Sequence, residues 1–365
     1  MAARKHFDLA VIGGGPAGTA SAITALQSGA SVVLFEAREF PRHKVCGEFV
    51  SAESLDVLNH LLRGVPKSAS PLQTAPTIDR ARLFLGRRVI EAPVSPAALS
   101  IARYQMDALL WEESQRAGVA AHSNCEAFTV EGEGPFGILT SDGTYTARAL
   151  IVAAGRWSQF TAERTLPLGP KWIGVKAHFR EPNPPPSTDL YFFEKGYCGV
   201  QPVGQGLVNA CAMVRSDVAT SLDEVFTLQP KLAERTAQWT AVTQPVSTAP
   251  LVYREPQPVR GNMVFTGDAA AFIDPFAGDG ISIALRSGRA AAHCLSEYWR
   301  GAMPLTEAVA RYRTAYTRDF APLIAAAARV RSLLSLPGIA RPAVFELLRF
   351  PGLLPYLIRK TRRAH

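Results

Sequence analysis

FDLAVIGGGPAGTASAITALQSGASVVLFE, residues 7–36, is the segment from which the architecture of the chain is inferred. Short apolar, β-branched runs at residues 7–12 and 31–35 predict two buried strands, and the alanine-rich residues 17–28 between them predict a helix. Because the connections are short, the segment predicts a right-handed β-α-β unit. Glycines fill the turn between the first strand and the helix, which is where such units bind nucleotides.

The glycine-rich turn fits the pattern G-x-G-x-x-G. Gly13 allows the tight turn, Gly15 has no side chain that would block a pyrophosphate, and Gly18 lets the helix pack closely on the strand. The phosphates of a nucleotide are then expected at the start of the helix, beside Pro16 and Ala17, where backbone N–H groups are free.

Glu36 ends the second predicted strand, 18 residues after Gly18. A carboxylate at this position accepts hydrogen bonds from ribose hydroxyls and repels a 2′-phosphate. The pattern therefore predicts a site for FAD or NAD and argues against NADP.

The composition is that of a globular protein with ample material for a core, since 47% of the residues are apolar and 19% are charged. The chain has 365 residues, which is long for one compact domain and suits two interleaved ones. The net charge is +8, and several basic residues lie near the C-terminus, where a solvated tail and a binding role both stay open. We expect no nucleic-acid partner.

The cysteines are scattered and none forms a C-x-x-C pair: Cys46, Cys125, Cys198, Cys211 and Cys294. Their odd number and their spacing predict neither a disulfide framework nor a metal site, and they indicate a reducing compartment. We recognise no signal peptide, and the apolar run at residues 323–328 is too short to span a membrane. We therefore expect a cytoplasmic protein.

Strand-like segments follow one another without helices between them at residues 171–180, 189–194, 197–202 and 206–215. They predict an antiparallel sheet, in which residues 204–206 form a hairpin turn. A further hairpin is expected around residues 83–89. Helices are expected at residues 100–117, 222–238 and 281–300, and the rest of the chain reads as helices broken by prolines.

Segments of α/β character lie on both sides of this sheet region, so the predicted fold class is α/β. We expect a Rossmann-type FAD-binding domain, an inserted antiparallel-sheet substrate domain and a helical C-terminal tail. The expected boundaries are residues 1–75, 99–165 and 255–300 for the FAD-binding domain, 76–98 and 166–254 for the substrate domain, and 301–365 for the C-terminal helices.

Three further segments are similar to motifs of one flavoprotein superfamily: RYQMD at residues 103–107, AGRWS at 154–158 and GDAA at 267–270. The superfamily includes para-hydroxybenzoate hydroxylase, the flavin-dependent halogenases and the geranylgeranyl reductases. Its motifs are R-x-x-[LM]-D, D-G-x-x-S and a Gly-Asp segment. The resemblance covers residues 7 to about 300 and implies that the cofactor is FAD.

The resemblance also implies which residues bind the cofactor. Arg103 would contact FAD, and Asp268 would bind the ribityl chain of the flavin. The segment that leads into the last predicted long helix would face the flavin ring, through Gly267, Pro275, Gly278, Gly280 and Ile281. Glycines let the backbone approach a flat ring, and the start of a helix carries partial positive charge that stabilises an anionic reduced flavin.

Residues 41–48, PRHKVCGE, resemble the P-R-x-K-x-C-G segment of the geranylgeranyl reductase branch, whose Cys-Gly pair lies near the flavin. The resemblance places Arg42, Lys44, Cys46 and Gly47 at the cofactor. Cys46 is a candidate proton donor or redox thiol, and a small packing residue is the alternative.

Residues 196–202 and 208–210 resemble the strand pair that forms the floor of the substrate cavity in the same branch. Tyr197 is therefore a second candidate catalytic residue. Phe192, Phe193 and Tyr197 either line an apolar pocket or belong to the core. The W-x-W-x-I-P motif of halogenases is absent, so we do not expect a halogenase.

These observations predict an FAD-dependent oxidoreductase that exchanges hydride between flavin N5 and a carbon of a hydrophobic small molecule, of isoprenoid or polyketide type. The alternatives are a monooxygenase that hydroxylates an aromatic or polyketide substrate, and a non-catalytic FAD-bound lipid carrier. Ala154 replaces the Asp of the D-G-x-x-S motif. The electron donor therefore stays open among NAD(P)H, a ferredoxin and a separate flavin reductase.

Residues 345–363 mix Leu, Phe and Tyr with Arg and Lys. Such a pattern is compatible with peripheral contact to an anionic membrane, although Pro351 and Pro355 would break the helix. A helix packed on the substrate domain is the alternative.

Overall fold

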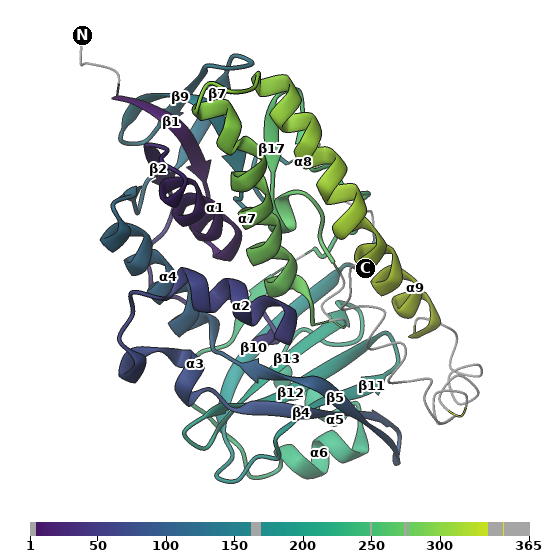
Figure 1. The fold of residues 1–365 in the computed structure, drawn as a ribbon. Coiled ribbons are helices and arrows are strands. Elements are labelled where there is room, and N and C mark those ends of the chain that lie inside the picture. The colour runs from purple at the N-terminus through teal and green to yellow at the C-terminus, as the bar shows by residue number, and fades with distance from the viewer. Residues whose placement is uncertain are drawn as a thin grey trace.

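The computed structural model describes residues 5–161, 169–248, 250–273, 276, 278–334 and 346. These residues form two sheets, of eight and nine strands. Figure 1 shows helices α1 and α7 beside the first sheet in its upper half, and the second sheet with α5 and α6 in its lower half. The predicted α/β architecture with helices towards its C-terminal end is confirmed.

The first sheet has the strand order β16-β17-β9-β1-β2-β6, and β8 joins β7 to β9. Strand β1 (Lys5–Ile12) runs parallel to β2 (Val32–Phe35) and to β9 (Gly143–Val152), with Leu9 opposite Val32. The central strands are apolar on both faces because helices cover this sheet. The other members are β6 (Ala120–His122), β7 (Ala127–Glu131), β8 (Phe136–Thr140), β16 (Val259–Arg260) and β17 (Met263–Phe265).

Helix α1 (Pro16–Gln27) packs against α4 (Arg103–Ala117) and α7 (Gly280–Trp299). Two glycines make this packing close. A Cβ atom on Gly18 would lie 1.7 Å from the carbonyl oxygen of Gly13, and one on Gly288 would lie 2.2 Å from that of Ala17. Side chains at either position would push α1 away from β1 or from α7.

The second sheet has the strand order β14-β10-β13-β12-β11-β4-β5-β3, with β15 beside β10. Its centre is a meander of β11 (Ser187–Phe193), β12 (Gly196–Gly204) and β13 (Leu207–Arg215), and β10 (Trp172–Arg180) pairs with β13 on the other side. The predicted turn at residues 204–206 joins β12 to β13. The pairing of β4 with β11 is parallel, because these strands come from separate parts of the chain and no hairpin constrains them. The short members are β3 (Phe49–Val50), β14 (Thr240–Ala241) and β15 (Val246–Thr248).

The hairpin expected around residues 83–89 is present, and its strands extend far beyond those residues. Strand β4 (Thr77–Leu85) and strand β5 (Arg88–Ser100) pair along most of their lengths. Pro93 and Pro96 lie within β5. They are tolerated because β3 pairs with β5 only at its last two residues, so most of β5 is an edge strand that needs no second row of N–H donors.

The helix predicted at residues 222–238 is wrong as one element. The structure has α5 (Leu222–Thr227) and α6 (Pro230–Thr236) instead. Pro230 has no N–H group and disfavours a helical conformation of the residue before it, so the helix stops and restarts there. Both helices cover the face of the second sheet that points away from the first.

The chain continues from α7 into α8 (Leu305–Asp319) and α9 (Ala321–Leu334). Helix α2 (Ala52–Leu61) packs on α7, and the short helix α3 (Pro71–Thr74) precedes β4. Of the basic and apolar residues 345–363, the structure describes only Glu346. Among the described helices, none is long and apolar enough to cross a membrane.

Candidate cofactor and substrate site

A cavity of about 1230 Å³ is lined by residues from both sheets. Among the described residues, every predicted site residue lines this cavity except Gly18, which lies beneath the glycine-rich turn. Pro275 lies outside the described residues. The predicted residues on the cavity wall are Gly13, Gly15, Pro16, Ala17, Glu36, Arg42, Lys44, Cys46, Gly47, Arg103, Tyr197, Gly267, Asp268, Gly278, Gly280 and Ile281.

The glycine-rich turn forms an open cradle at the start of α1. Gly13 has a φ of +107°, and a Cβ atom there would lie 2.5 Å from the carbonyl oxygen of Ala153. At Gly15, the nearest atom to such a Cβ would be Nζ of Lys44, at 3.6 Å. Backbone N–H groups of a helix start and an ammonium group above them suit a pyrophosphate.

Glu36 is buried at the end of β2 and holds the neighbouring turns. Its Oε2 accepts a hydrogen bond from the N–H of Gly14 at 2.9 Å, and its Oε1 accepts one from Nη2 of Arg42 at 2.9 Å. The guanidinium of Arg42 lies 4.9 Å from the ring centre of Phe40. Oε1 also accepts a hydrogen bond from the N–H of Arg38 at 3.1 Å, so the capacity for ribose hydroxyls lies at the second lone pair of Oε2.

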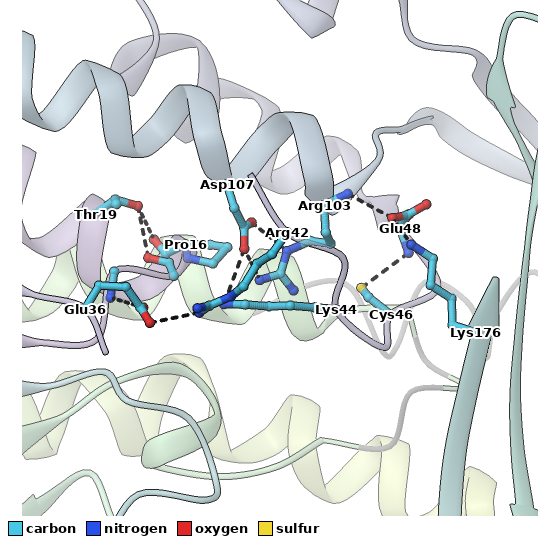
Figure 2. A network of polar contacts seen from close by, with 12 residues as sticks. Pro16, Thr19, Glu36, Arg42, Lys44, Cys46, Glu48, Arg103, Asp107 and Lys176 are labelled. Atoms are coloured by element: carbon cyan, nitrogen blue, oxygen red, sulfur yellow. Dashed lines mark hydrogen bonds and ion pairs between the residues drawn. The ribbon is translucent and has the colours of Figure 1, made fainter. Parts of the chain in front are cut away.

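The RYQMD segment begins α4 and builds an ion pair between successive turns of this helix. Nε and Nη2 of Arg103 each lie 2.6 Å from a carboxylate oxygen of Asp107, and Nζ of Lys44 lies 3.5 Å from Asp107 (Figure 2). Burial would raise the pKa of Asp107, yet Arg103 and Lys44 lower it. Asp107 was not among the predicted site residues, although its spacing of four from Arg103 is the signal that places both on one helix face.

The Cys46–Glu48 turn joins the cofactor half of the cavity to the second sheet. Glu48 has a φ of +63°, and its N–H lies 3.3 Å from Sγ of Cys46. Burial raises the pKa of Cys46, so the sulfur stays a protonated thiol at neutral pH. Nδ2 of Asn209, on β13, donates to the carbonyl oxygen of Cys46 at 2.9 Å and fastens the turn to the sheet.

A buried charged cluster lies behind this turn and was not predicted from the sequence. Oε1 of Glu48 lies 2.6 Å from Nζ of Lys176 and accepts a hydrogen bond from the N–H of Arg103 at 2.9 Å. Oε2 of Glu48 lies 2.8 Å from Nε2 of His178. Burial would raise the pKa of Glu48, but the hydrogen bond from His178 and the charge of Lys176 lower it. Figure 2 shows the contacts of Glu48 with Lys176, Arg103 and Cys46, and separately the contact of Glu36 with Arg42.

The opposite end of the cavity is apolar and aromatic. Tyr197 of β12 and Phe276 meet edge to face with their ring centres 6.0 Å apart, and Met213 and Leu251 belong to the same cluster. Phe192 and Phe193 are core residues, on opposite faces of β11, and they are absent from the cavity wall. This end of the cavity fits an apolar molecule.

The segment that precedes α7 closes the cavity beside α1. Gly267 has a φ of +57°, and its N–H donates to Oγ of Ser287 at 3.0 Å. Burial raises the pKa of Asp268, although the charge of Arg156 opposes the shift. Gly278 has a φ of +71° and lies against the ring of Phe49.

These features together fit FAD. The open cradle at Gly15 with the ammonium of Lys44 suits the pyrophosphate, and the Glu36 carboxylate suits the adenosine ribose. Asp268 is a partly buried carboxylate with a raised pKa that gains from hydroxyl donors, which a ribityl chain provides. The flavin itself supplies the redox chemistry when it is bound.

Residues 7–161 match the family model described as pyridine nucleotide-disulphide oxidoreductase. The chain is 26% identical to the menaquinone reductase of Mycolicibacterium smegmatis, in a match that covers 96% of this chain and 90% of that protein. It is 24% identical to digeranylgeranylglycerophospholipid reductase 1 of Methanopyrus kandleri, with 98% and 97% covered.

Solved structures share the fold. The flavin-dependent brominase Bmp2 superposes with a TM-score of 0.80 at 21% identity, covering 98% of this chain and 93% of the brominase. A geranylgeranyl bacteriochlorophyll reductase-like protein from Thermoplasma acidophilum superposes with a TM-score of 0.74 at 20% identity, covering 98% and 100%. The resemblance seen in the sequence motifs is confirmed by these relatives, which include a digeranylgeranylglycerophospholipid reductase and a geranylgeranyl reductase-like structure, and the chain is an FAD-dependent oxidoreductase enzyme.

Proposed function

We propose that the enzyme reduces or dehydrogenates a hydrophobic small molecule of isoprenoid or polyketide type. The observation that carries the proposal is the form of the cavity. Its polar end is built from Gly15, Glu36 and Lys44, its apolar end from Tyr197 and Phe276, and the space between them is continuous. A substrate in the apolar end would therefore lie next to the flavin.

The chain contributes orientation, exclusion of water and a proton. The aromatic and aliphatic side chains of the apolar end bind a carbon skeleton by burial, which favours the substrate by about 25 cal/mol per Å² of apolar surface. Transfer of a hydride to carbon requires a proton at a second atom. Cys46 holds a proton at Sγ at neutral pH because burial raises its pKa, and it lies on the cavity wall.

The names of the relatives support a reductase. One relative is named for menaquinone and the other for a digeranylgeranyl phospholipid, and both matches cover most of either chain. The brominase has the same fold, but at 21% identity this match gives no information on the reaction that the present chain catalyses. Reduction without oxygen is therefore the proposal, and oxygen-dependent hydroxylation is its competitor.

The test is an anaerobic reoxidation experiment. The FAD-loaded enzyme is reduced with dithionite under argon, a polyprenyl quinone or a geranylgeranyl lipid is added, and the flavin absorbance is followed. The proposal predicts that the flavin band returns without air and that the product has gained two hydrogen atoms. A reduced enzyme that reoxidises only with oxygen, and adds one oxygen atom to an aromatic compound, would identify a monooxygenase instead.

The same spectra identify the electron donor. NADH, NADPH and a reduced ferredoxin are offered separately to the oxidised enzyme, and bleaching of the flavin band is recorded for each. Because Ala154 stands where the superfamily motif has Asp, we propose that a protein donor reduces the flavin faster than either nicotinamide. If NADPH alone bleached the flavin band as fast as reduced ferredoxin does, the proposal of a protein donor would be wrong.

A further inference from the structure

We propose that Arg156 binds an acidic group, a carboxylate or a phosphate, on the molecule that occupies the apolar end of the cavity. The inference rests on the proposed function in one respect only, namely that this end of the cavity holds the substrate. It adds a chemical class: the substrate is an apolar body that carries an anionic group.

Arg156 is fixed in place between the two sheets. It lies just after β9, it lines the cavity, and its Nη2 donates to Oγ1 of Thr248 on β15 at 2.9 Å. Its guanidinium carbon lies 4.3 Å from the ring centre of Phe272 and 5.8 Å from that of Trp157. The hydrogen bond and the two aromatic faces hold the guanidinium in one orientation at the cavity wall.

The charge of Arg156 is incompletely compensated. Its Nε is buried and has no hydrogen-bond partner among the described residues, and no carboxylate there forms an ion pair with it. The nearest acidic influence is Asp268, which favours the charged guanidinium but does not overcome burial, so the pKa of Arg156 is lowered.

Two other arginines with little exposed surface differ. Arg103 is held at two nitrogens by Asp107, and Arg235 contacts both Asp189 and Glu181. A buried guanidinium is stable when an anion completes its hydrogen bonds, and its planar fork matches a carboxylate or a phosphate. Arg156 therefore lacks the kind of partner that its counterparts have.

The missing anion is assigned to the substrate rather than to the pyrophosphate of FAD. The phosphate cradle is at the start of α1, where Gly15 and the ammonium of Lys44 already face each other. Arg156, in contrast, is bonded to the second sheet and stacked on Phe272, which packs in the apolar cluster with Tyr197. An acid at Arg156 would hold its apolar chain against that cluster.

The test measures binding, so it requires no turnover. Isothermal titration of the FAD-loaded protein uses decanoate, decyl phosphate and decanol, each below its micelle-forming concentration, and inorganic phosphate alone. The proposal predicts that at least one of the two acids binds about tenfold more tightly than the alcohol, as a charge-assisted hydrogen bond provides. Inorganic phosphate alone binds much more weakly than decyl phosphate, because it lacks the chain.

Three variants sharpen the result. Arg156→Gln should remove the preference for the acid and leave the affinity for decanol unchanged, and Arg156→Lys should keep part of the preference. Arg87→Gln is the matched control, because it removes the same charge from a side chain that is 79% exposed. Flavin absorbance and a thermal melt of each variant verify that it is folded and loaded.

Three outcomes would overturn the inference. Equal binding of acids and alcohol to the wild-type protein shows that no anion site exists, and retention of the preference in Arg156→Gln places that site elsewhere. Loss of FAD in Arg156→Gln, with the acid preference intact when FAD is supplied in excess, makes Arg156 a cofactor residue. A negative reoxidation experiment leaves the binding result standing, so the two proposals fail independently.

Discussion

The two faces of the second sheet each bury one carboxylate, and the two carboxylates have different surroundings. Glu48 lies on the face towards the cofactor, held by Lys176 and His178 of β10 and by the N–H of Arg103. Asp189 lies on the far face, held by Arg82 of β4 and Arg235 of α6. Both side chains are fully buried.

The difference lies in what each carboxylate joins. Asp189 ties β4, β11 and α6 together within the sheet domain, so its contacts serve the fold. Glu48 ties the Cys46–Glu48 turn and the start of α4 to β10, so its contacts also place two segments of the cavity wall. The two carboxylates are therefore equally buried and equally charged, but they differ in role. The residues that each one contacts show whether it serves the fold alone or also the cavity wall.

The largest expected effect comes from Glu48→Gln. The variant leaves Lys176 buried beside a neutral amide, which we expect to lower the free energy of unfolding by about 3–5 kcal/mol. Because a single amide oxygen is left to accept from the N–H of Arg103, Lys176 and His178, the turn and the start of α4 are held less firmly, and FAD affinity should also fall by about tenfold. Urea unfolding measures the first quantity, and flavin titration of the apoprotein measures the second.

A second variant keeps this prediction testable if Glu48→Gln fails to fold. The double variant Glu48→Gln with Lys176→Met removes both charges, so it should recover most of the loss of about 3–5 kcal/mol expected for the single change. Its FAD affinity should remain low. Wild-type FAD affinity in the folded double variant would show that Glu48 serves the fold alone.

Asp189→Asn is the matched change on the far face. It leaves Arg82 and Arg235 without their shared carboxylate, and we expect a loss of about 3–5 kcal/mol in the free energy of unfolding. The affinity for FAD should be that of the wild type, because neither arginine lines the cavity. If the FAD affinity of Asp189→Asn fell as far as that of Glu48→Gln, the two carboxylates would not differ in role.

The two networks also show what the sequence could and could not predict. The phosphate cradle was predictable because its residues are consecutive and the β-α-β pattern is local. The pair of Arg103 and Asp107 was within reach, since four residues separate them on one helix. The partners of Glu48 were not, because Lys176 lies 128 residues away and the register of β10 against the turn is a tertiary property.

A weak signal did exist in WIGVKAHFR, residues 172–180. Lys176 and His178 are two apart, so they share one face of the strand, while the residues between and beside them face an apolar core. Polar residues at alternate positions are equally typical of a strand face exposed to solvent. Only the packing of residues 41–48 on this face distinguishes the two cases.

Acid should remove the contribution of Glu48 more gently than mutation does. The pKa of Glu48 in the folded protein is below its ordinary value of 4.5, so the ionised form is stabilised by folding. The contribution is fully present above pH 4.5 and is lost as the pH falls through the lower folded-state value. The difference in unfolding free energy between wild type and Glu48→Gln should therefore shrink below pH 4.5, and a constant difference down to the acid transition would contradict this assignment.

The smallest expected effect belongs to Tyr191→Phe on the far face. The hydroxyl of Tyr191 accepts a hydrogen bond from Nη1 of Arg235 at 3.1 Å, and burial raises the pKa of Tyr191 to about 12, so it is a neutral partner at all ordinary pH values. Its removal takes away one hydrogen bond while Asp189 and Glu181 still hold Arg235, so the loss should be about 1 kcal/mol. Urea unfolding checks the magnitude, and FAD affinity should not change. A loss close to that of Asp189→Asn would mean that the tyrosine, rather than the carboxylate, keeps Arg235 on the sheet.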